Sequence, residues 1–357
     1  MRTGRWIVTL VVALGLASAA FALTGKNGWT ASTVTTAADV KANSGYLSDF
    51  GGVQWDTLGT VEFWSINSSQ RSGLAVDGSG NMYTMVWGYD YVSGMSGPFY
   101  YGLIRVEGST ITTLVQDSGD SVSGGSQLQR VVVSPSTIGG LTKGHPVVIR
   151  WVDDVSAHGP AGDYSIVSVD PDNGTETLIY TLYDRTTGIG VFEIDGSGTG
   201  TDGTIYLGNG TAITRLTWSG SDWVEDSLSG AGHLLVGPDG MLYTSGQGWG
   251  VVTSKMSDHP IYRTDPATGA TSVWGYVERS SSIYSWNFDA NGTLWFGLHS
   301  TTRKQAKNPN YIASGVAGGV TNINNRISES AGYPYYLAGD SNAVYVMENF
   351  ATINALE

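Results

Sequence analysis

Three residues of this sequence combine a type and a position that could support acid–base chemistry: Glu193, Arg130 and His233. Each lies in or just before an apolar segment that leads into a tight turn, Glu193 two residues before the turn residue and the others four residues before it. A carboxylate among apolar neighbours needs a cation or a metal ion as partner, because burial of an unpaired charge is costly. This pattern predicts Glu193 or His233 as a general base beside Arg130 as an electrostatic stabiliser. A purely structural ion pair is the alternative.

Two oxygen-bearing side chains occupy matching places and could bind a metal ion. Asn287 has the same position in a later segment as Glu193 has in its own, so both are candidate ligands for Ca²⁺ or another divalent ion. Only these two stand out, so we expect no cofactor, with a divalent ion as the alternative. The sequence contains neither His-Glu-x-x-His nor Gly-x-Ser-x-Gly, which disfavours zincins and nucleophile-elbow hydrolases.

Long, irregular stretches rich in aromatic residues supply candidates for binding. Flat aromatic surface next to hydrogen-bonding groups suits sugars or peptide segments, although packing between loops would also explain several of these aromatic residues. Polar and aromatic positions in the inner apolar segments could extend the same site at the predicted mouth of a channel. The predicted ligand-binding residues are Trp87, Tyr89, Trp151, Asp153, Trp249, His259, His299, Ser285, Asn287 and Tyr335.

A repeated unit must position all of these residues. It consists of an apolar run, a turn and a second apolar run; in the regular copies the turn is built on Asp or Asn with Gly. Alternating apolar residues predict strands, while Asp bonds to backbone N–H groups and Gly accepts the positive φ that closes a hairpin. Six copies begin at Leu74, Arg130, Phe192, Leu234, Trp286 and Tyr336.

A second family of hairpins lies between these copies, starting at Tyr101, Tyr164, Ile213 and Ile261. Two hairpins in tandem form a four-stranded antiparallel sheet, which is typical of a propeller blade. We therefore predict an all-β fold, a β-propeller of six four-stranded antiparallel blades. A seventh blade built from residues 45–59 is the alternative.

The last copy reaches the end of the sequence before it completes four strands. We expect Gly59–Ile66 to supply the missing outer strand and so to close the ring. On this interpretation residues 59–357 are the propeller domain. Residues 23–58 are then a linker or an extra edge segment.

The Asp-x-x-Gly-x-apolar-Tyr hairpins, with Asp-Pro-x-Thr-Gly turns such as that at Asp265, resemble the six-bladed propellers of the NHL, gluconolactonase and streptogramin-lyase type. The resemblance covers about residues 59–357 and rests on turn and packing residues, which specify a blade rather than a chemistry. It implies a six-bladed propeller. That superfamily includes lactonases with a channel metal, a lyase with a channel His and Glu, and binding modules, so the reaction stays open.

The N-terminus predicts export. Residues 1–22 have two arginines, an apolar run and a small-x-small site ending at Ala22, as in a secretory signal peptide. The net charge of -13 disfavours nucleic acid and anionic membranes as partners, and the absence of cysteine excludes disulfides and thiolate metal sites. We expect a secreted or periplasmic protein that does not associate with the membrane once its signal is removed.

Three functions are compatible with these features. The first is a recognition module that binds a glycan or protein through the long-loop face. The second is a lactonase-like hydrolase or a lyase centred on the channel, and the third is a structural component of the cell surface or extracellular matrix. Whether the protein is an enzyme stays open at this point.

Overall fold

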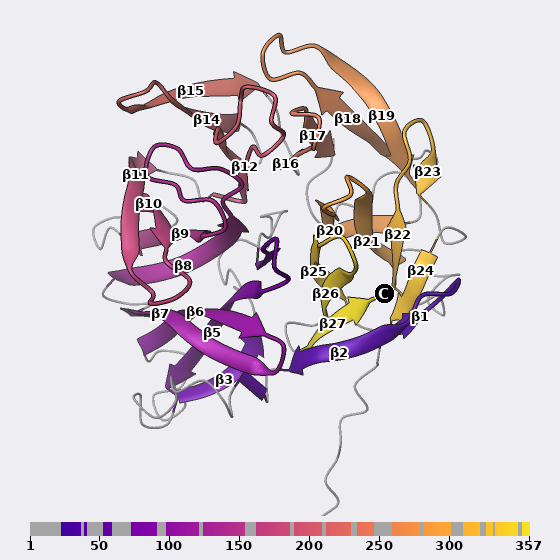
Figure 1. The fold of residues 1–357 in the computed structure, drawn as a ribbon, viewed down its shortest axis with the longest axis horizontal. Helices are drawn as coiled ribbons and strands as arrows, with labels where there is room; N and C mark the ends of the chain where they lie inside the picture. The colour runs from indigo at the N-terminus through magenta and orange to yellow at the C-terminus, as the bar shows by residue number, and fades with distance from the viewer. Residues whose placement is uncertain are drawn as a thin grey trace, which may run out of the picture.

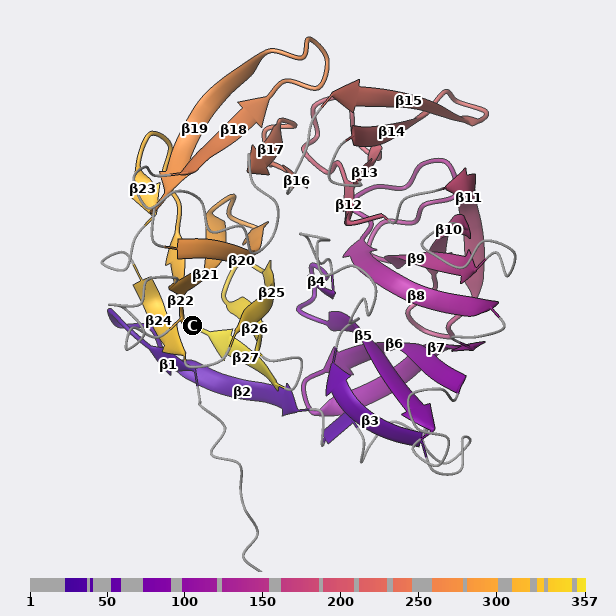
Figure 2. The ribbon, with the colours of Figure 1, turned by 180° about the vertical axis from the view of Figure 1, so that it is seen from behind.

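The computed structural model is a β-propeller of six four-stranded antiparallel blades arranged in a ring (Figures 1 and 2), as the repeats predict. Within the residues that it describes, only residues 39 and 40 are helical, and we find there no helix of the length and apolarity that a membrane crossing requires. The described residues are 23–36, 39–40, 53–58, 73–90, 98–120, 124–153, 162–185, 189–208, 212–229, 234–245, 259–278, 281–300, 310–321, 326–330, 333–348 and 352–357.

The strands of each blade follow one another from the axis outwards. Blades 1 to 3 consist of β4 (Leu74–Val76), β5 (Met82–Asp90), β6 (Pro98–Glu107) and β7 (Thr110–Asp120); β8 (Gly124–Val133), β9 (Pro146–Asp153), β10 (Gly162–Val169) and β11 (Glu176–Arg185); and β12 (Val191–Ile194), β13 (Ile205–Gly208), β14 (Ala212–Trp218) and β15 (Trp223–Ser229). Blades 4 to 6 consist of β16 (Leu234–Val236), β17 (Leu242–Ser245), β18 (His259–Thr264) and β19 (Thr271–Val277); β20 (Ser281–Phe288), β21 (Leu294–Ser300), β22 (Asn310–Ser314) and β24 (Arg326–Ser330); and β25 (Pro334–Gly339), β26 (Val344–Glu348), β27 (Thr352–Leu356) and β2 (Ala31–Thr36).

An aspartate side chain stabilises the turn between the two innermost strands of a blade. In blade 1 the carboxylate Oδ1 of Asp77 accepts the backbone N–H groups of Ser79 at 2.8 Å and Asn81 at 3.0 Å. Gly80 adopts a φ of 83° in this turn, a value that glycine reaches without the steric cost of a Cβ. Asp289 organises the corresponding turn of blade 5 through the same kind of bonds.

The ring is closed by a strand from the N-terminal segment, but not by the one expected from the sequence. Ala31–Thr36 forms β2 and pairs antiparallel with β27 at the outer edge of blade 6, so the prediction that Gly59–Ile66 takes this place is wrong. Those eight residues lie outside the described part of the chain. The alternative of a seventh blade is also wrong, because β3 (Val53–Leu58) pairs with β5 of blade 1.

Two further short strands connect neighbouring blades. β1 (Thr24–Gly25) extends blade 5 by pairing with β24, and β23 (Val320–Thr321), which belongs to the blade 5 region of the chain, runs parallel to β19 of blade 4. Together β1, β2 and β3 place the N-terminal segment along blades 5, 6 and 1 (Figure 1).

Among the described residues, the apolar core forms six clusters, one between each pair of adjacent blades. On the inner strands, residues an even number of positions before the turn residue face the following blade. Ala75 of blade 1 shares a cluster with Val131 of blade 2, and Leu235 of blade 4 shares one with Trp286 of blade 5. This alternation decides which way every candidate side chain of an inner strand points.

Candidate functional site

Four aromatic rings gather where the inner strands of blades 5 and 6 begin. Tyr284 of β20 stacks on Tyr333, with 5.2 Å between ring centroids and 27° between planes. His299 of β21 packs against both rings, at 5.3 Å and 5.2 Å, and Tyr335 of β25 packs edge-on against Tyr284 at 5.5 Å. We call these four residues the ring cluster. The end of the propeller on which they lie, opposite the turn at Asp289, is the loop face.

Two β-bulges place tyrosines in this cluster. The pairing of β20 with β21 shifts register at Tyr284, and the pairing of β25 with β26 shifts register at Tyr335. Both residues lie five positions before the turn residue of their blade, Asp289 or Asp340. A bulge turns its extra residue out of the regular alternation and is frequent beside functional sites. The equivalent bulges explain why two adjacent blades direct a tyrosine to the same place.

The ring cluster is partly open to solvent and carries no full charge near neutral pH. Tyr333 is the most accessible ring, with 38% of its surface exposed, and Tyr284, His299 and Tyr335 are half-buried. Burial lowers the pKa of His299 below the usual value of 6.5, because the charged imidazolium is poorly solvated there. The cluster therefore offers flat apolar area together with phenol and imidazole groups that both donate and accept hydrogen bonds.

Ser285 and Asn287, two predicted ligand-binding residues, are used to join blades 5 and 6. The Ser285 hydroxyl donates to the carbonyl of Pro334 at 2.6 Å, and the Asn287 amide donates to the carbonyl of Leu337 at 3.0 Å. Both acceptors belong to β25, the innermost strand of blade 6. The polar groups of Ser285 and Asn287 therefore bind the backbone of β25.

The predicted pair of Glu193 and Arg130 is not formed. Arg130 is buried and its Nε donates to the carbonyl of Gly190 at 3.4 Å, at the start of blade 3. Val191, on the same side of β12 as Glu193, packs in the cluster that contains Leu234 of blade 4. Glu193 consequently faces blade 4, away from blade 2, and the two side chains never meet.

Glu193 has no hydrogen bond or ion pair with any residue that the structure describes. Burial raises the pKa of its carboxyl group from 4.5 to about 8, since the carboxylate would lose its hydration without gaining a partner among the described residues. Glu193 is therefore neutral at pH 7. His233, its other predicted partner, lies outside the described residues.

The two predicted metal ligands lie on separate blades. Glu193 and Asn287 belong to blades 3 and 5, with blade 4 between them. In the described ranges no three Asp, Glu or His side chains gather as ligands of one ion. The Asn287 amide is directed toward blade 6 by its bond to Leu337, whereas Glu193 faces blade 4.

The remaining predicted binding residues are spread over other blades. Trp151 packs against the apolar cluster between blades 2 and 3, and its Nε1 is buried with no described partner. His259 begins β18 and is buried, with 8% of its surface exposed. Trp87 and Tyr89 lie in β5 and Asp153 in β9, where the backbone alone is described, and Trp249 lies outside the described residues.

The structure thus brings His299 and Tyr335 together with two residues that the sequence did not single out, Tyr284 and Tyr333. A signal for Tyr284 exists in the repeats, because it and Tyr335 stand at the same distance from their turn residues. Blade 2 has the same register shift at Gln129. Reading the aligned copies one residue further would have revealed this position.

No family model and no curated protein matches this sequence. Solved structures with a similar arrangement include a catalytically inactive virginiamycin B lyase from Staphylococcus aureus, with 13% identity over 85% of this chain and 98% of that one and a TM-score of 0.39. An α-L-arabinanase from Penicillium chrysogenum has 11% identity, 85% and 98% coverage and a TM-score of 0.47. A protein from Lactobacillus plantarum has 15% identity, 79% and 80% coverage and a TM-score of 0.45. Likeness at this level says nothing about activity.

Proposed function

We propose that this chain is an exported recognition module that binds a glycan or a protein segment on its loop face, with the ring cluster as the contact surface. The observation that supports this proposal is the gathering of four partly accessible aromatic rings from two adjacent blades. Rigid aromatic side chains contribute large contact area at low entropic cost, and they dominate many binding surfaces.

The geometry gives less support to an enzyme centred on the axis. In that hypothesis Glu193 or His233 acts with Arg130. Glu193 and Arg130 face different blade interfaces, and His233 lies outside the described residues. A carboxyl group with a pKa of about 8 is protonated at neutral pH, so most of it is not available as a base. Recognition requires none of these groups, because the ring cluster lies two blades away.

Export is part of the proposal and rests on the signal-like pattern of residues 1–22. Leu23, the first residue after the predicted cleavage site, is 5% exposed and shares a cluster with Trp295 of blade 5. Leu23 therefore belongs to the folded propeller, and cleavage directly before it would leave this contact in place. Mass spectrometry of protein recovered from the medium or periplasm would give the mature N-terminus, and retention of residues 1–22 would contradict cleavage.

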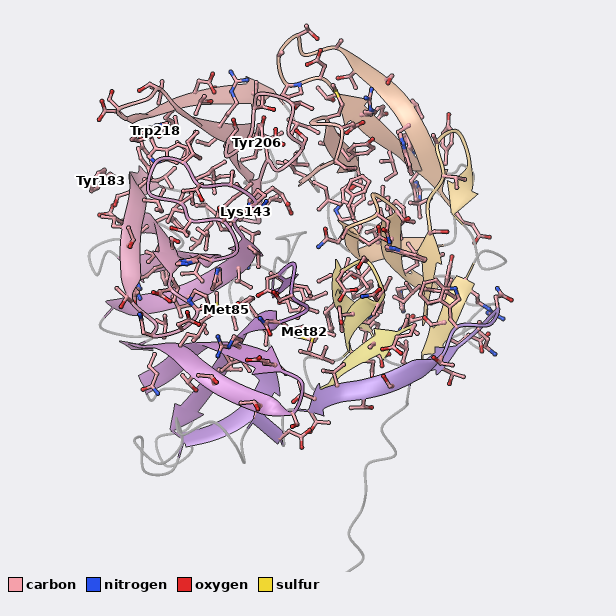
Figure 3. All side chains as sticks on the ribbon, in the orientation of Figure 1. Met82, Met85, Lys143, Tyr183, Tyr206 and Trp218 are labelled. Carbon is pink, nitrogen blue, oxygen red and sulfur yellow. The ribbon has the colours of Figure 1, made fainter. Side chains whose placement is uncertain are left out.

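Binding is tested with the mature protein immobilised against a glycan array and a peptide library. We expect at least one class of ligand to be retained, and the double variant Tyr284→Ala, Tyr333→Ala to lose it. The matched control is Tyr183→Ala, because Tyr183 is 69% exposed but lies at the outer rim of blade 2, far from the axis (Figure 3). Equal binding by the double variant would remove the ring cluster from the proposal.

A further inference from the structure

The packing of the ring cluster restricts the shape of its ligand. Tyr284, His299 and Tyr333 are mutually in contact at 5.2 to 5.3 Å between centroids, and Tyr335 lies 5.9 Å from Tyr333. An aromatic cage for a cation needs rings that stand apart around an empty centre. Here the rings fill the space between themselves, so they present a platform and not a cage.

The backbone beside the platform is already engaged. An extended peptide that added itself to a sheet edge would need unpaired carbonyl groups. On β25, however, the carbonyl groups of Pro334 and Leu337 already accept hydrogen bonds from Ser285 and Asn287. These two carbonyl groups are therefore not available for the main-chain bonds of an added peptide strand.

Among the residues that the structure describes, the groups around the platform would not select a charged ligand. His299 is held neutral by burial, and phenol hydroxyls are uncharged at neutral pH. The carboxylate across the strand pair from Pro334, Glu348, is 4% exposed and accepts a hydrogen bond from Asn354 at 2.8 Å. It is thus turned into the blade and not toward the loop face.

We infer that the ring cluster binds a neutral carbohydrate, one sugar ring of which stacks on Tyr333. This inference rests on the proposed function and narrows it to one ligand class. The C–H groups of a pyranose face pack on an aromatic ring, while its hydroxyl groups exchange hydrogen bonds with donors and acceptors that carry no charge. The partly exposed ring of Tyr333, which is stacked on Tyr284 and surrounded by other uncharged rings among the described residues, satisfies both requirements.

The experiment uses the mature protein on an array of neutral, acidic and amino oligosaccharides, followed by calorimetric titration with the best neutral hexasaccharide. We expect neutral glycans to bind, with Tyr333→Ala weakening binding by about tenfold or more and Tyr333→Phe changing it by less than about threefold, because the ring and not its hydroxyl makes the stacking contact. Tyr183→Ala should match the wild type. Calorimetric unfolding of each variant verifies that it is folded.

Other outcomes would contradict the ligand class, the position of the site or the proposed function. Binding of acidic or amino glycans, of trimethylammonium ligands or of peptides that depends on Tyr333 would refute a neutral sugar and leave the recognition site standing. Binding of neutral glycans that Tyr333→Ala and Tyr284→Ala both leave unchanged would place the site elsewhere. Failure of glycans, trimethylammonium ligands and peptides alike to bind the folded protein would overturn the inference and the proposed function together.

Discussion

Glu193 couples the stability of the propeller to pH. The folded state keeps the proton on this carboxyl group up to about pH 8, whereas the unfolded chain releases it near pH 4.5. Between these values the unfolded state binds fewer protons, so stability falls as pH rises, by about 1.4 kcal/mol per unit. Glu193→Gln has no proton to lose. The difference in free energy of unfolding between this variant and the wild type should therefore shift by about 4 kcal/mol in favour of the variant from pH 5 to pH 8. Denaturant titrations at these pH values measure the difference, and parallel pH profiles would contradict it.

His299 should act in the opposite direction. Burial lowers the pKa of its imidazole, so below about pH 6.5 the unfolded chain takes up a proton that the folded state resists. The stability that the neutral imidazole allows is therefore lost as pH falls through this range. His299→Phe retains an aromatic ring in the cluster and should show a smaller drop in melting temperature from pH 7.5 to pH 5. Identical drops in variant and wild type would show that His299 is protonated in the folded protein.

At this scale, the sequence revealed the polar exceptions but not their partners. The repeats identify Glu193 and Arg130 as unusual residues at even offsets from their turns. Residues an even number of positions before the turn residue all face the following blade. Arg130 therefore points toward blade 3 and Glu193 toward blade 4, so the two side chains cannot pair. This common direction depends on how the blades pack against each other. The sequence of one repeat does not show which neighbouring blade its side chains face.

Hydrogen bonds within the hairpin explain why the repeat keeps an aromatic residue on the second strand of most blades. The hydroxyl of Tyr83 donates to Asp77 Oδ2 at 3.0 Å, and the indole of Trp295 donates to Asp289 Oδ2 at 2.9 Å. In blade 3 the turn is longer, and the hydroxyl of Thr201 donates to Oδ2 of Asp195 instead. The element was predictable because both partners lie in one short segment.

Blade 3 supplies a matched control for the energy of this bond. Tyr83 and Tyr206 are both fully buried, but the Tyr206 hydroxyl has no partner among the described residues. Tyr83→Phe should lower the free energy of unfolding by about 1 kcal/mol or more, because Asp77 loses a buried donor. Tyr206→Phe should be neutral or stabilising, since it removes an unsatisfied group. Equal losses in the two variants would mean that Tyr206 is hydrogen-bonded in solution.

The element that the sequence did not identify is the closing strand. Ala31–Thr36 is rich in small polar residues, and only Thr35 in it is buried. Gly59–Ile66 has a more apolar pattern, which is why it was the stronger candidate. An outer edge strand needs main-chain pairing more than apolar side chains, so hydrophobic periodicity is a weak guide to it.

For the molecule as a whole, β2 pairs a segment near the N-terminus with β27 and so closes the ring. Proline substitutions can measure how much this pairing contributes. Thr30 and Glu357 exchange both backbone hydrogen bonds, at 2.9 and 3.1 Å. In an antiparallel pair such positions alternate, so Ser32 also bonds to β27 while the N–H of Ala31 points away from it.

Ser32→Pro therefore removes a bond of the closing blade and Ala31→Pro does not. We expect Ser32→Pro to lower the free energy of unfolding by about 2 kcal/mol and to promote association through the exposed edge of β27. Ala31→Pro should stay close to the wild type in denaturant titration and in size-exclusion chromatography. If both variants unfolded alike, β2 would hold its place by side-chain packing of the kind that Ala31 makes beside Leu356, and ring closure would not depend on its hydrogen bonds.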